Sequence, residues 1–273
     1  MKQPLVSVCI PTFQHKFFIA DCLESVLAQK TAFDFEIILG EDDSTDGTRE
    51  ICQEYAARYP EKIRLFLRKD QDKIPILGRK SGRINYLENF REARGKYIAM
   101  LDGDDCWVRS DKLQKQVEKL EKNPEAFLCS SNFLDGPRLN QILSSSETSD
   151  QEFTFYPKAS LTKVSYLGHV SNWVLRNNLS EFLASNAAHK GPILDLLLFS
   201  FIKKKGGIIH WSAPSSFYRT NEKSYHVNKL SNSRHLELFW SSWYQFKDIH
   251  RNPIQFIRFL GYLVKKHFGR NPD

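Results

Sequence analysis

The chain has 273 residues, of which 41% are hydrophobic and 26% charged, proportions that are ordinary for a soluble globular protein of one large or two small domains. No apolar run is long enough to cross a bilayer, and no signal peptide precedes the first strand-like run. The five cysteines lie singly, without a Cys-x-x-Cys pair, which argues against a zinc site and against a disulfide framework and predicts a reducing, cytoplasmic location.

The net charge of +7 is concentrated near the C-terminus. Between Arg251 and Arg270 there are five Lys or Arg residues and no Asp or Glu. Such a basic protein binds nucleic acid, a membrane surface or an acidic substrate. No nucleic-acid motif accompanies the charge, so the last two kinds of partner are favoured.

The first half of the chain alternates apolar, strand-like runs with segments of helical periodicity. We predict strands over 5–10, 35–40, 63–67, 97–101 and 126–130, and helices over 17–29, 48–59, 85–93 and 112–122. This alternation predicts an α/β fold with a mostly parallel sheet and right-handed crossovers. In such sheets ligands bind at the carboxyl ends of the strands.

The alternation ends near Pro137, and residues 140–151 are polar and rich in serine, as in a surface loop or a mobile segment. A helix over 191–205 and a strand over 208–211 are predicted further on. The tail is aromatic and helical from residue 234 onward. One interpretation of the tail is an amphipathic helix on anionic lipid, and the other is a helix packed on the rest of the protein or on another subunit.

Three carboxylates directly follow the predicted strand at 97–101. Asp102, Asp104 and Asp105 lie within four residues of one another, where they would repel unless a cation or hydrogen-bond donors met them. A divalent metal carrying a phosphorylated ligand is the economical explanation. The alternative is an acidic turn in solvent.

A second acidic segment, residues 41–48, lies between a predicted strand and a predicted helix. In the plainest interpretation Ser44, Thr45 or Asp46 caps that helix. An EF-hand calcium loop would need Glu where Gln53 stands, and a haloacid-type phosphatase would need Asp where Ser44 stands. Both of these loops therefore lack a required residue.

Five segments, taken together and in order, resemble the family 2 glycosyltransferases. They comprise VSVCIPTF at 6–13, ESVLAQ at 24–29, FEII at 35–38, EDDSTDGT at 41–48, and GKYIA with LDGDDCW between 95 and 107. The resemblance is close over about 5–135 and weaker to about Arg219.

The resemblance implies a GT-A fold, a Rossmann-like sheet flanked by helices that binds a nucleotide-sugar through Mn²⁺ or Mg²⁺, with a helical C-terminal extension. Residues 1–135 would form the nucleotide-sugar half of the domain, 136–230 its acceptor half and 231–273 a basic tail. The implied donor-site residues are Pro11, Thr12, Glu41, Asp42, Arg83, Asp102 and Asp104, with Asp105 and Asp104 on the metal. Glu41 stands where Asp is more usual.

Individual roles follow from the same resemblance. Thr12 and Asp42 match positions that contact the base, and a carboxylate that accepts the imide proton would select uracil over cytosine. Arg83, with Asn89 nearby, would contact the diphosphate, the alternative being a solvated basic loop. Asp195 would be the catalytic base that deprotonates the acceptor, the alternative being a helix N-cap or a buried ion pair.

His169 and His226 are further candidates for contacts to phosphate or acceptor, although a lone histidine is more often structural. The implied activity is metal-dependent, inverting transfer of one sugar, with a UDP-sugar favoured, to a hydroxyl of a saccharide or lipid-linked acceptor in cell-surface polysaccharide biosynthesis. A cytoplasmic enzyme, peripheral on the inner face of the plasma membrane and able to form oligomers, would fit this activity.

Two other classes stay open at this point. A nucleotidyltransferase that makes a nucleotide-sugar would use a similar sheet and metal, but it needs a Gly-rich loop where Pro11-Thr12-Phe13 stands. A degenerate nucleotide-binding module would have lost the carboxylates, whereas Asp104 and Asp105 are intact.

Overall fold

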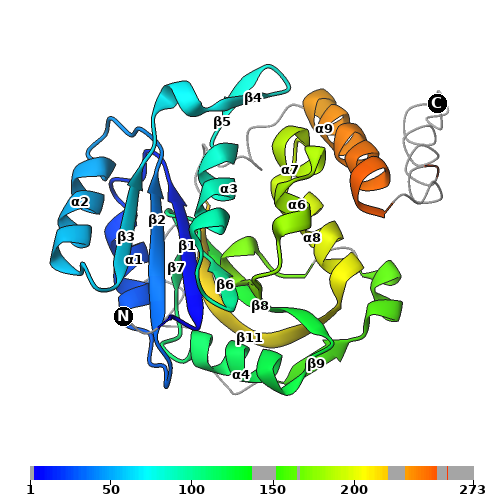
Figure 1. The fold of residues 1–273 in the computed structure, drawn as a ribbon, viewed down its shortest axis with the longest axis horizontal. Helices are drawn as coiled ribbons and strands as arrows, with labels where there is room; N and C mark the ends of the chain where they lie inside the picture. The colour runs from blue at the N-terminus through cyan, green and yellow to red at the C-terminus, as the bar shows by residue number, and fades with distance from the viewer. Residues whose placement is uncertain (1–2, 137–151, 165–166, 221–230, 251–256, 258–273) are drawn as a thin grey trace.

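The computed structural model describes residues 3–136, 152–164, 167–220, 231–250 and 257, and these residues are built around one large curled sheet (Figure 1). The strand order is β3-β2-β1-β6-β10-β8-β11-β7, and β9 pairs with β11. The strands are β1 (Val6–Thr12), β2 (Phe35–Glu41), β3 (Ile63–Leu67), β6 (Tyr97–Met100), β7 (Cys106–Trp107), β8 (Ala126–Gly136), β9 (Phe153–Tyr156), β10 (Val174–Arg176) and β11 (Gly207–Arg219).

The sheet is mostly parallel, as the sequence predicts. β3, β2, β1 and β6 pair in parallel, and so do β8 and β11. The short strand β10 lies between β6 and β8 and is antiparallel to both. β7 and β9 are antiparallel to β11. The antiparallel strands β7, β9 and β10 are additions that the sequence does not predict.

Helices cover both faces of the sheet, and each face has its own apolar core. One core contains residues of α1 (Ile19–Leu27), α2 (Thr48–Arg58) and α4 (Lys112–Lys122). The other contains residues of α3 (Arg83–Glu92), α6 (Ser180–Leu183), α7 (Asn186–Lys190) and α8 (Leu194–Lys205). Successive side chains of a strand point to opposite faces, so Val8 and Ile10 enter the first core and Cys9 the second. The expected α/β architecture is confirmed.

The structure extends or shortens several predicted elements. The strand expected at 126–130 continues to Gly136, and the one expected at 208–211 continues to Arg219. The helix expected from residue 191 begins at Leu194. Strands β8 and β11 pair directly, so one sheet contains strands from both sides of residue 136. The three-part division of the chain stays a prediction, and residues 140–151 lie outside the described part.

A hairpin of β4 (Ile74–Ile76) and β5 (Arg79–Ser81) precedes α3, where we predicted only a basic loop. Its turn residues Leu77 and Gly78 both have positive φ, +48° and +78°. Turns of this hand match the twist of a two-residue hairpin. Leucine is rarely found in such a position, which is why the sequence does not announce the turn.

The C-terminal part continues as α9 (Ser231–Tyr244) and a π-helical segment, η4 (Gln245–His250). Tyr244 and Ile249 pack against the second core, whereas Leu236 and Trp240 are exposed. Most of the basic segment 251–270 lies outside the described residues, so membrane contact by the tail stays a prediction. No helix within the described ranges is long and apolar enough to span a membrane.

Lys112, at the start of α4, is fully buried beneath the sheet. Its Nζ donates to Gln116 Oε1 at 2.7 Å and lies 4.3 Å from the centroid of the Trp107 ring. Burial disfavours the ammonium form and lowers the pKa of Lys112 to about 7. The folded protein is therefore more stable when the amine of Lys112 is neutral than when it is charged.

We predict that the titration of Lys112 contributes to the pH dependence of the free energy of unfolding. Between about pH 7 and pH 10 the unfolded chain holds the Lys112 proton and the folded protein does not, so this residue makes stability rise with pH. Relative to wild type, Lys112→Met should be stabilised most near pH 7, and the difference should shrink by about 1 kcal/mol per pH unit up to pH 8.5. Urea denaturation at three pH values measures it, with Lys122→Met on the exposed face of α4 as control. A difference independent of pH would contradict the prediction.

Candidate active site

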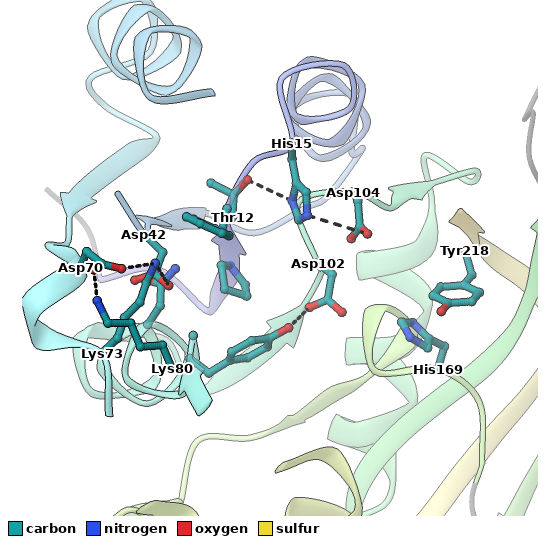
Figure 2. A pocket seen from close by; sticks show the side chains of 15 residues that line it. Thr12, His15, Asp42, Asp70, Lys73, Lys80, Asp102, Asp104, His169 and Tyr218 are labelled. Atoms are coloured by element: carbon teal, nitrogen blue, oxygen red, sulfur yellow. Dashed lines mark hydrogen bonds and ion pairs between the residues drawn. The ribbon is translucent and has the colours of Figure 1, made fainter. Parts of the chain in front are cut away.

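Two adjoining cavities open at the carboxyl ends of β1, β2 and β6 (Figure 2). The larger has a volume of about 660 Å³ and the smaller about 320 Å³. They share the lining residues Gly82, Tyr86, Asp102 and His169. Ligands bound in the two cavities would therefore meet at the carboxylate of Asp102.

Pro11 and Thr12, at the end of β1, line the larger cavity, as predicted for a donor site. Thr12 is almost fully buried, and its Oγ1 lies 3.2 Å from His15 Nδ1. The backbone N–H of Gly103 donates to the carbonyl of Pro11 at 3.1 Å. A Cβ at Gly103 would lie 2.6 Å from Thr12 Oγ1, so only glycine lets the acidic loop approach β1 this closely.

Glu41 and Asp42 follow β2 and point in different directions. The Glu41 carboxylate is fully buried, accepts the backbone N–H of Ser44 at 2.7 Å and pairs with Arg49 Nε at 2.5 Å. Glu41 is absent from the described lining of both cavities, so it shapes the loop rather than facing a ligand. Asp42 lines the larger cavity, with Lys73 Nζ 3.6 Å from its carboxylate.

Burial raises the pKa of Asp42 to about 6, and the neighbouring Lys73 ammonium opposes this rise. Lys73 comes from the end of a 3₁₀ turn before β4, and its Nζ also lies 3.8 Å from the centroid of the Phe13 ring. Lys73 could not be placed from the sequence because the hairpin that follows it, β4 and β5, was not predicted.

The acidic loop after β6 separates its carboxylates (Figure 2). Asp102 accepts a hydrogen bond from the Tyr86 hydroxyl at 2.6 Å, and Asp104 turns toward His15, 3.8 Å from Nε2. Asp105 is fully buried and accepts from Ser171 Oγ at 2.5 Å and from the backbone N–H of Arg219 at 3.1 Å.

Asp102, Asp105 and His169 form a group that could hold a metal. Each offers one ligand atom, and these atoms all lie within 4.8 Å of one another. His169 Nδ1 is 3.4 Å from Asp105 Oδ2. Asp105 was predicted as a ligand and Asp102 as one of the three carboxylates beside the metal, whereas the place of His169 in the group appears only in three dimensions. Asp104 is not a member of this group, and its predicted role on the metal stays a prediction.

The charge state of the group fits a cation. Burial, followed by the charge of Asp104, raises the pKa of Asp102 to about 7. Burial and the two neighbouring aspartates raise the pKa of Asp105 well above its usual range. Two carboxylates that repel each other beside an imidazole are the donor set that a divalent cation satisfies.

Asp195, in the first turn of α8, lines the smaller cavity. Part of the wall of this cavity is apolar, formed by Met100, Val170, Pro192, Ile193 and Leu194. Asp195 Oδ1 accepts the backbone N–H of Leu196 at 2.9 Å. The predicted base is thus placed beside the group of Asp102 and His169, on the side away from Asp42.

Arg83 differs from the expectation. Its buried guanidinium donates to the carbonyl oxygens of Ala188 at 2.9 Å, Gly191 at 2.6 Å and Pro192 at 3.1 Å. It lines the smaller cavity and not the larger one. In this conformation Arg83 therefore does not face the larger cavity, where contact with a diphosphate was expected.

Other basic and amide residues are placed as follows. The lysines that line the larger cavity are Lys73 and Lys80, and Lys80 pairs with Asp70. Asn89 is buried against Gly40 of β2, its Oδ1 accepts from Arg68 Nη2 at 3.3 Å, and it is absent from the lining of both cavities. Asn85 lines the larger cavity instead. His226 lies outside the described residues.

A Rossmann-like sheet that gathers carboxylates at the carboxyl ends of its strands defines a ligand-binding α/β protein. Residues 7–182 match the model of Glycosyl transferase family 2, so the chain belongs to this family. The resemblance seen in the five sequence segments is confirmed.

Known proteins similar to the chain include the putative teichuronic acid biosynthesis glycosyltransferase TuaG of Bacillus subtilis. The two are 33% identical over 149 residues, which are 54% of this chain and 55% of TuaG. The chain spans between about a fifth and about half of the length of these curated relatives.

Solved structures with a similar fold include S. aureus TarS 1–349 in complex with UDP-GlcNAc. The TM-score is 0.64 at 14% identity, over 97% of this chain and 73% of that one. The mannosyltransferase PcManGT from Pyrobaculum calidifontis, in complex with GDP-Man and Mn²⁺, gives a TM-score of 0.59 at 17% identity, over 100% and 77% of the two chains. At these identities the likeness shows a shared fold.

We predict that removing the Asp102 charge stabilises the metal-free protein at neutral pH. The folded-state pKa of about 7 lies above the unfolded value, so ionisation of Asp102 makes stability fall as pH rises from about 4 to about 7. In EDTA, Asp102→Asn should melt about 3 °C or more above wild type at pH 7.5 and close to it at pH 4. Mn²⁺ at pH 7.5 should raise the melting temperature of wild type more than that of the variant. Equal shifts at both pH values would refute the electrostatic account.

Proposed function

We propose that this protein transfers a single sugar from a nucleotide-sugar, with a UDP-sugar favoured, to a hydroxyl of a saccharide or lipid-linked acceptor. The observation that carries the proposal is the pair of adjoining cavities with Asp102 and His169 between them. One cavity has the residues expected of a donor site, and the other has a carboxylate suited to activating an acceptor. Membership of Glycosyl transferase family 2 supports the same reaction class.

The larger cavity would hold the nucleotide. Asp42 would accept the imide N–H of the base, and the Lys73 ammonium beside it would face the adjacent carbonyl oxygen. Uracil and guanine offer this N–H and C=O pair, whereas cytosine offers a lone pair and an amino group. Thr12 and Asp104 would lie along the ribose. Lys80, which also lines this cavity, would contact the diphosphate.

Asp105, Asp102 and His169 would hold Mn²⁺ or Mg²⁺, with Asp104 as a further candidate ligand. When bound, such a cation stabilises the negative charge that develops on the departing nucleoside diphosphate. The structural neighbour PcManGT, which is described with Mn²⁺, supports a metal in this fold. The protein's own part is to hold the carboxylates close together, and the donors Tyr86, Ser171 and Arg219 N–H favour their ionised form against the effect of burial.

The smaller cavity would hold the acceptor. Asp195 would take the proton of the acceptor hydroxyl while its oxygen attacks the anomeric carbon of the donor sugar, and this single displacement inverts the configuration. Apolar walls such as Met100 and Val170 suit the apolar face of a sugar ring or a lipid link. The name of TuaG favours an acceptor in cell-surface polysaccharide biosynthesis. Such an enzyme would work in the cytoplasm, peripheral on the inner face of the membrane.

The donor site is tested by ligand-dependent melting. UDP with Mn²⁺ should raise the melting temperature by about 5 °C at saturating concentration, because a ligand that binds only the folded state stabilises it by mass action. GDP should act less, and CDP should have little effect. Asp105→Ala should abolish the metal-dependent part of the shift, whereas Asp34→Ala, at an exposed carboxylate on the amino side of β2, should keep it. No shift with any nucleotide would move the chain to the class of degenerate modules.

The catalytic assignment is tested by release of UDP from UDP-glucose, UDP-galactose and UDP-GlcNAc, with p-nitrophenyl glycosides as acceptors. Asp195→Asn should lower the rate at least about 100-fold and leave the dissociation constant of UDP with Mn²⁺ within about twofold of wild type. Full activity of Asp195→Asn would eliminate it as the base. Synthesis of a nucleotide-sugar from UTP and a sugar phosphate would instead make the chain a nucleotidyltransferase.

A further inference from the structure

Gly82 and Arg83 link the two cavities along the backbone, while the Arg83 side chain lies on the smaller cavity only. Arg83 is the first residue of α3 and directly follows Gly82, which lines both cavities. A Cβ on Gly82 would lie 3.3 Å from Asp42 Oδ2, so the backbone on this side is in contact with the donor-side carboxylate. On the other side the Arg83 side chain reaches the turn between α7 and α8.

That turn receives an unusual amount of support from one side chain. The guanidinium donates to Ala188, near the end of α7, and to Gly191 and Pro192 in the connection to α8. Ala188 and Gly191 are buried and Pro192 is half-buried, and a guanidinium can satisfy several such acceptors at once because its donors form a planar fork. Helix α8 has no side-chain cap of its own at Ile193.

The turn is tightly packed on the opposite side. A Cβ on Gly191 would lie 2.2 Å from Leu197 Cδ1 and 2.7 Å from the carbonyl oxygen of Ala187. The hydrogen bonds from Arg83 on one side and the contact with Leu197 on the other therefore restrict the backbone conformation of the turn. Asp195 follows within one helical turn, so the conformation of the turn sets the position of its carboxylate in the smaller cavity.

The positive charge of Arg83 also interacts with the carboxylate of Asp195. Burial lowers the pKa of Arg83 to about 10, and the negative charge of Asp195 opposes this change, so the two side chains interact electrostatically. At neutral pH the guanidinium remains protonated and keeps all its donors. A lysine at this position could satisfy fewer of the three carbonyls and only as a point charge.

We propose that Arg83 is a positioning residue for the acceptor side of the site, which fixes the turn at 188–193 and thereby the carboxylate of Asp195, rather than a ligand of the donor diphosphate. This inference rests on the proposed function for its consequence in catalysis, but its structural part does not. Loss of the guanidinium should let the turn move and misplace the base, while the nucleotide cavity keeps its residues.

The test compares Arg83→Lys and Arg83→Met with a matched control, Arg176→Lys. Arg176 also donates to three carbonyl oxygens, those of Ala126, Leu120 and Asn123, but these lie near the end of α4, outside the lining of both cavities. Both sites therefore lose the same kind of contact. Differences between the variants report position in the fold rather than loss of an arginine that donates to backbone carbonyls, although Arg176 is half-buried and Arg83 is buried.

Three measurements are made on each variant of the full chain. Amide hydrogen exchange should become faster over residues 188–197 in both Arg83 variants and stay at the wild-type rate there in Arg176→Lys. The dissociation constant of UDP with Mn²⁺ should change less than about twofold. The turnover number for UDP release with an acceptor present should fall about 10- to 100-fold in Arg83→Met and less in Arg83→Lys, as expected when a base is displaced by about 1 Å.

Two results would overturn the proposal. Weakening of UDP binding by about tenfold or more in Arg83→Lys, with unchanged exchange at 188–197, would make Arg83 a diphosphate ligand as the sequence analysis expected. Unchanged exchange with unchanged UDP binding would make it a residue of general stability only. If no variant, including wild type, releases UDP, the proposed function fails, and the exchange and binding measurements still decide the role of Arg83.

Discussion

Two carboxylates that are partly or wholly removed from water, Asp102 and Asp105, lie beside each other at the end of a central strand. Several distant parts of the fold supply the hydrogen-bond donors that stabilise them there. Their raised pKa values record the cost of placing them there. The donors that offset the cost come from separate places in the chain: Tyr86 from α3, Ser171 from the turn before β10, and the backbone of Arg219 from the end of β11.

The same constraint explains why polar groups penetrate so deeply beneath the site. The Trp107 indole N–H donates to the carbonyl of Ser171 at 2.8 Å, and the Gln116 amide donates to the carbonyl of Asn172 at 2.9 Å. Gln116 is in turn held by Lys112. This buried network fixes the turn at 170–172 that delivers Ser171 to Asp105 and carries His169 next to it. A polar network of this kind rigidifies its surroundings when its members are satisfied.

The sequence predicts the half of the site that is local and leaves out the half that is assembled from a distance. Pro11, Thr12, Asp42 and the acidic loop stand directly after apolar runs, and parallel pairing of those runs is enough to bring them together. Position alone does not tell which way a side chain turns. Glu41 stands next to Asp42 and yet faces Arg49, and Arg83 stands in a basic loop and yet faces backbone carbonyls.

Lys73 was missed altogether, and His169 was named without its place beside Asp102 and Asp105, because both depend on elements with weak local signals. Lys73 lies just before a hairpin whose turn contains Leu77 at positive φ, and His169 arrives through a turn followed by a strand of three residues, β10. Such short strands are stabilised by their neighbours in the sheet, so no periodicity within them could have revealed them. The long strand β11 was shortened in the prediction because Pro214 interrupts its pattern, whereas the structure accommodates it at an irregularity in the pairing with β8.

The position of β10 has a consequence for how the protein comes into being. In the described sheet, β8 is hydrogen-bonded to β10 and β11, both of which are synthesised after it, and β10 stands between it and β6. As the chain leaves the ribosome, β3, β2, β1 and β6 can assemble early, whereas β8 waits with unpaired edges until about 40 more residues have emerged. Completion of the sheet is thus a late, long-range step, and long-range pairing of this kind is slow. A fragment that ends at Gly136 would carry β8 as an exposed strand, so the two halves of this site have to be made as one piece.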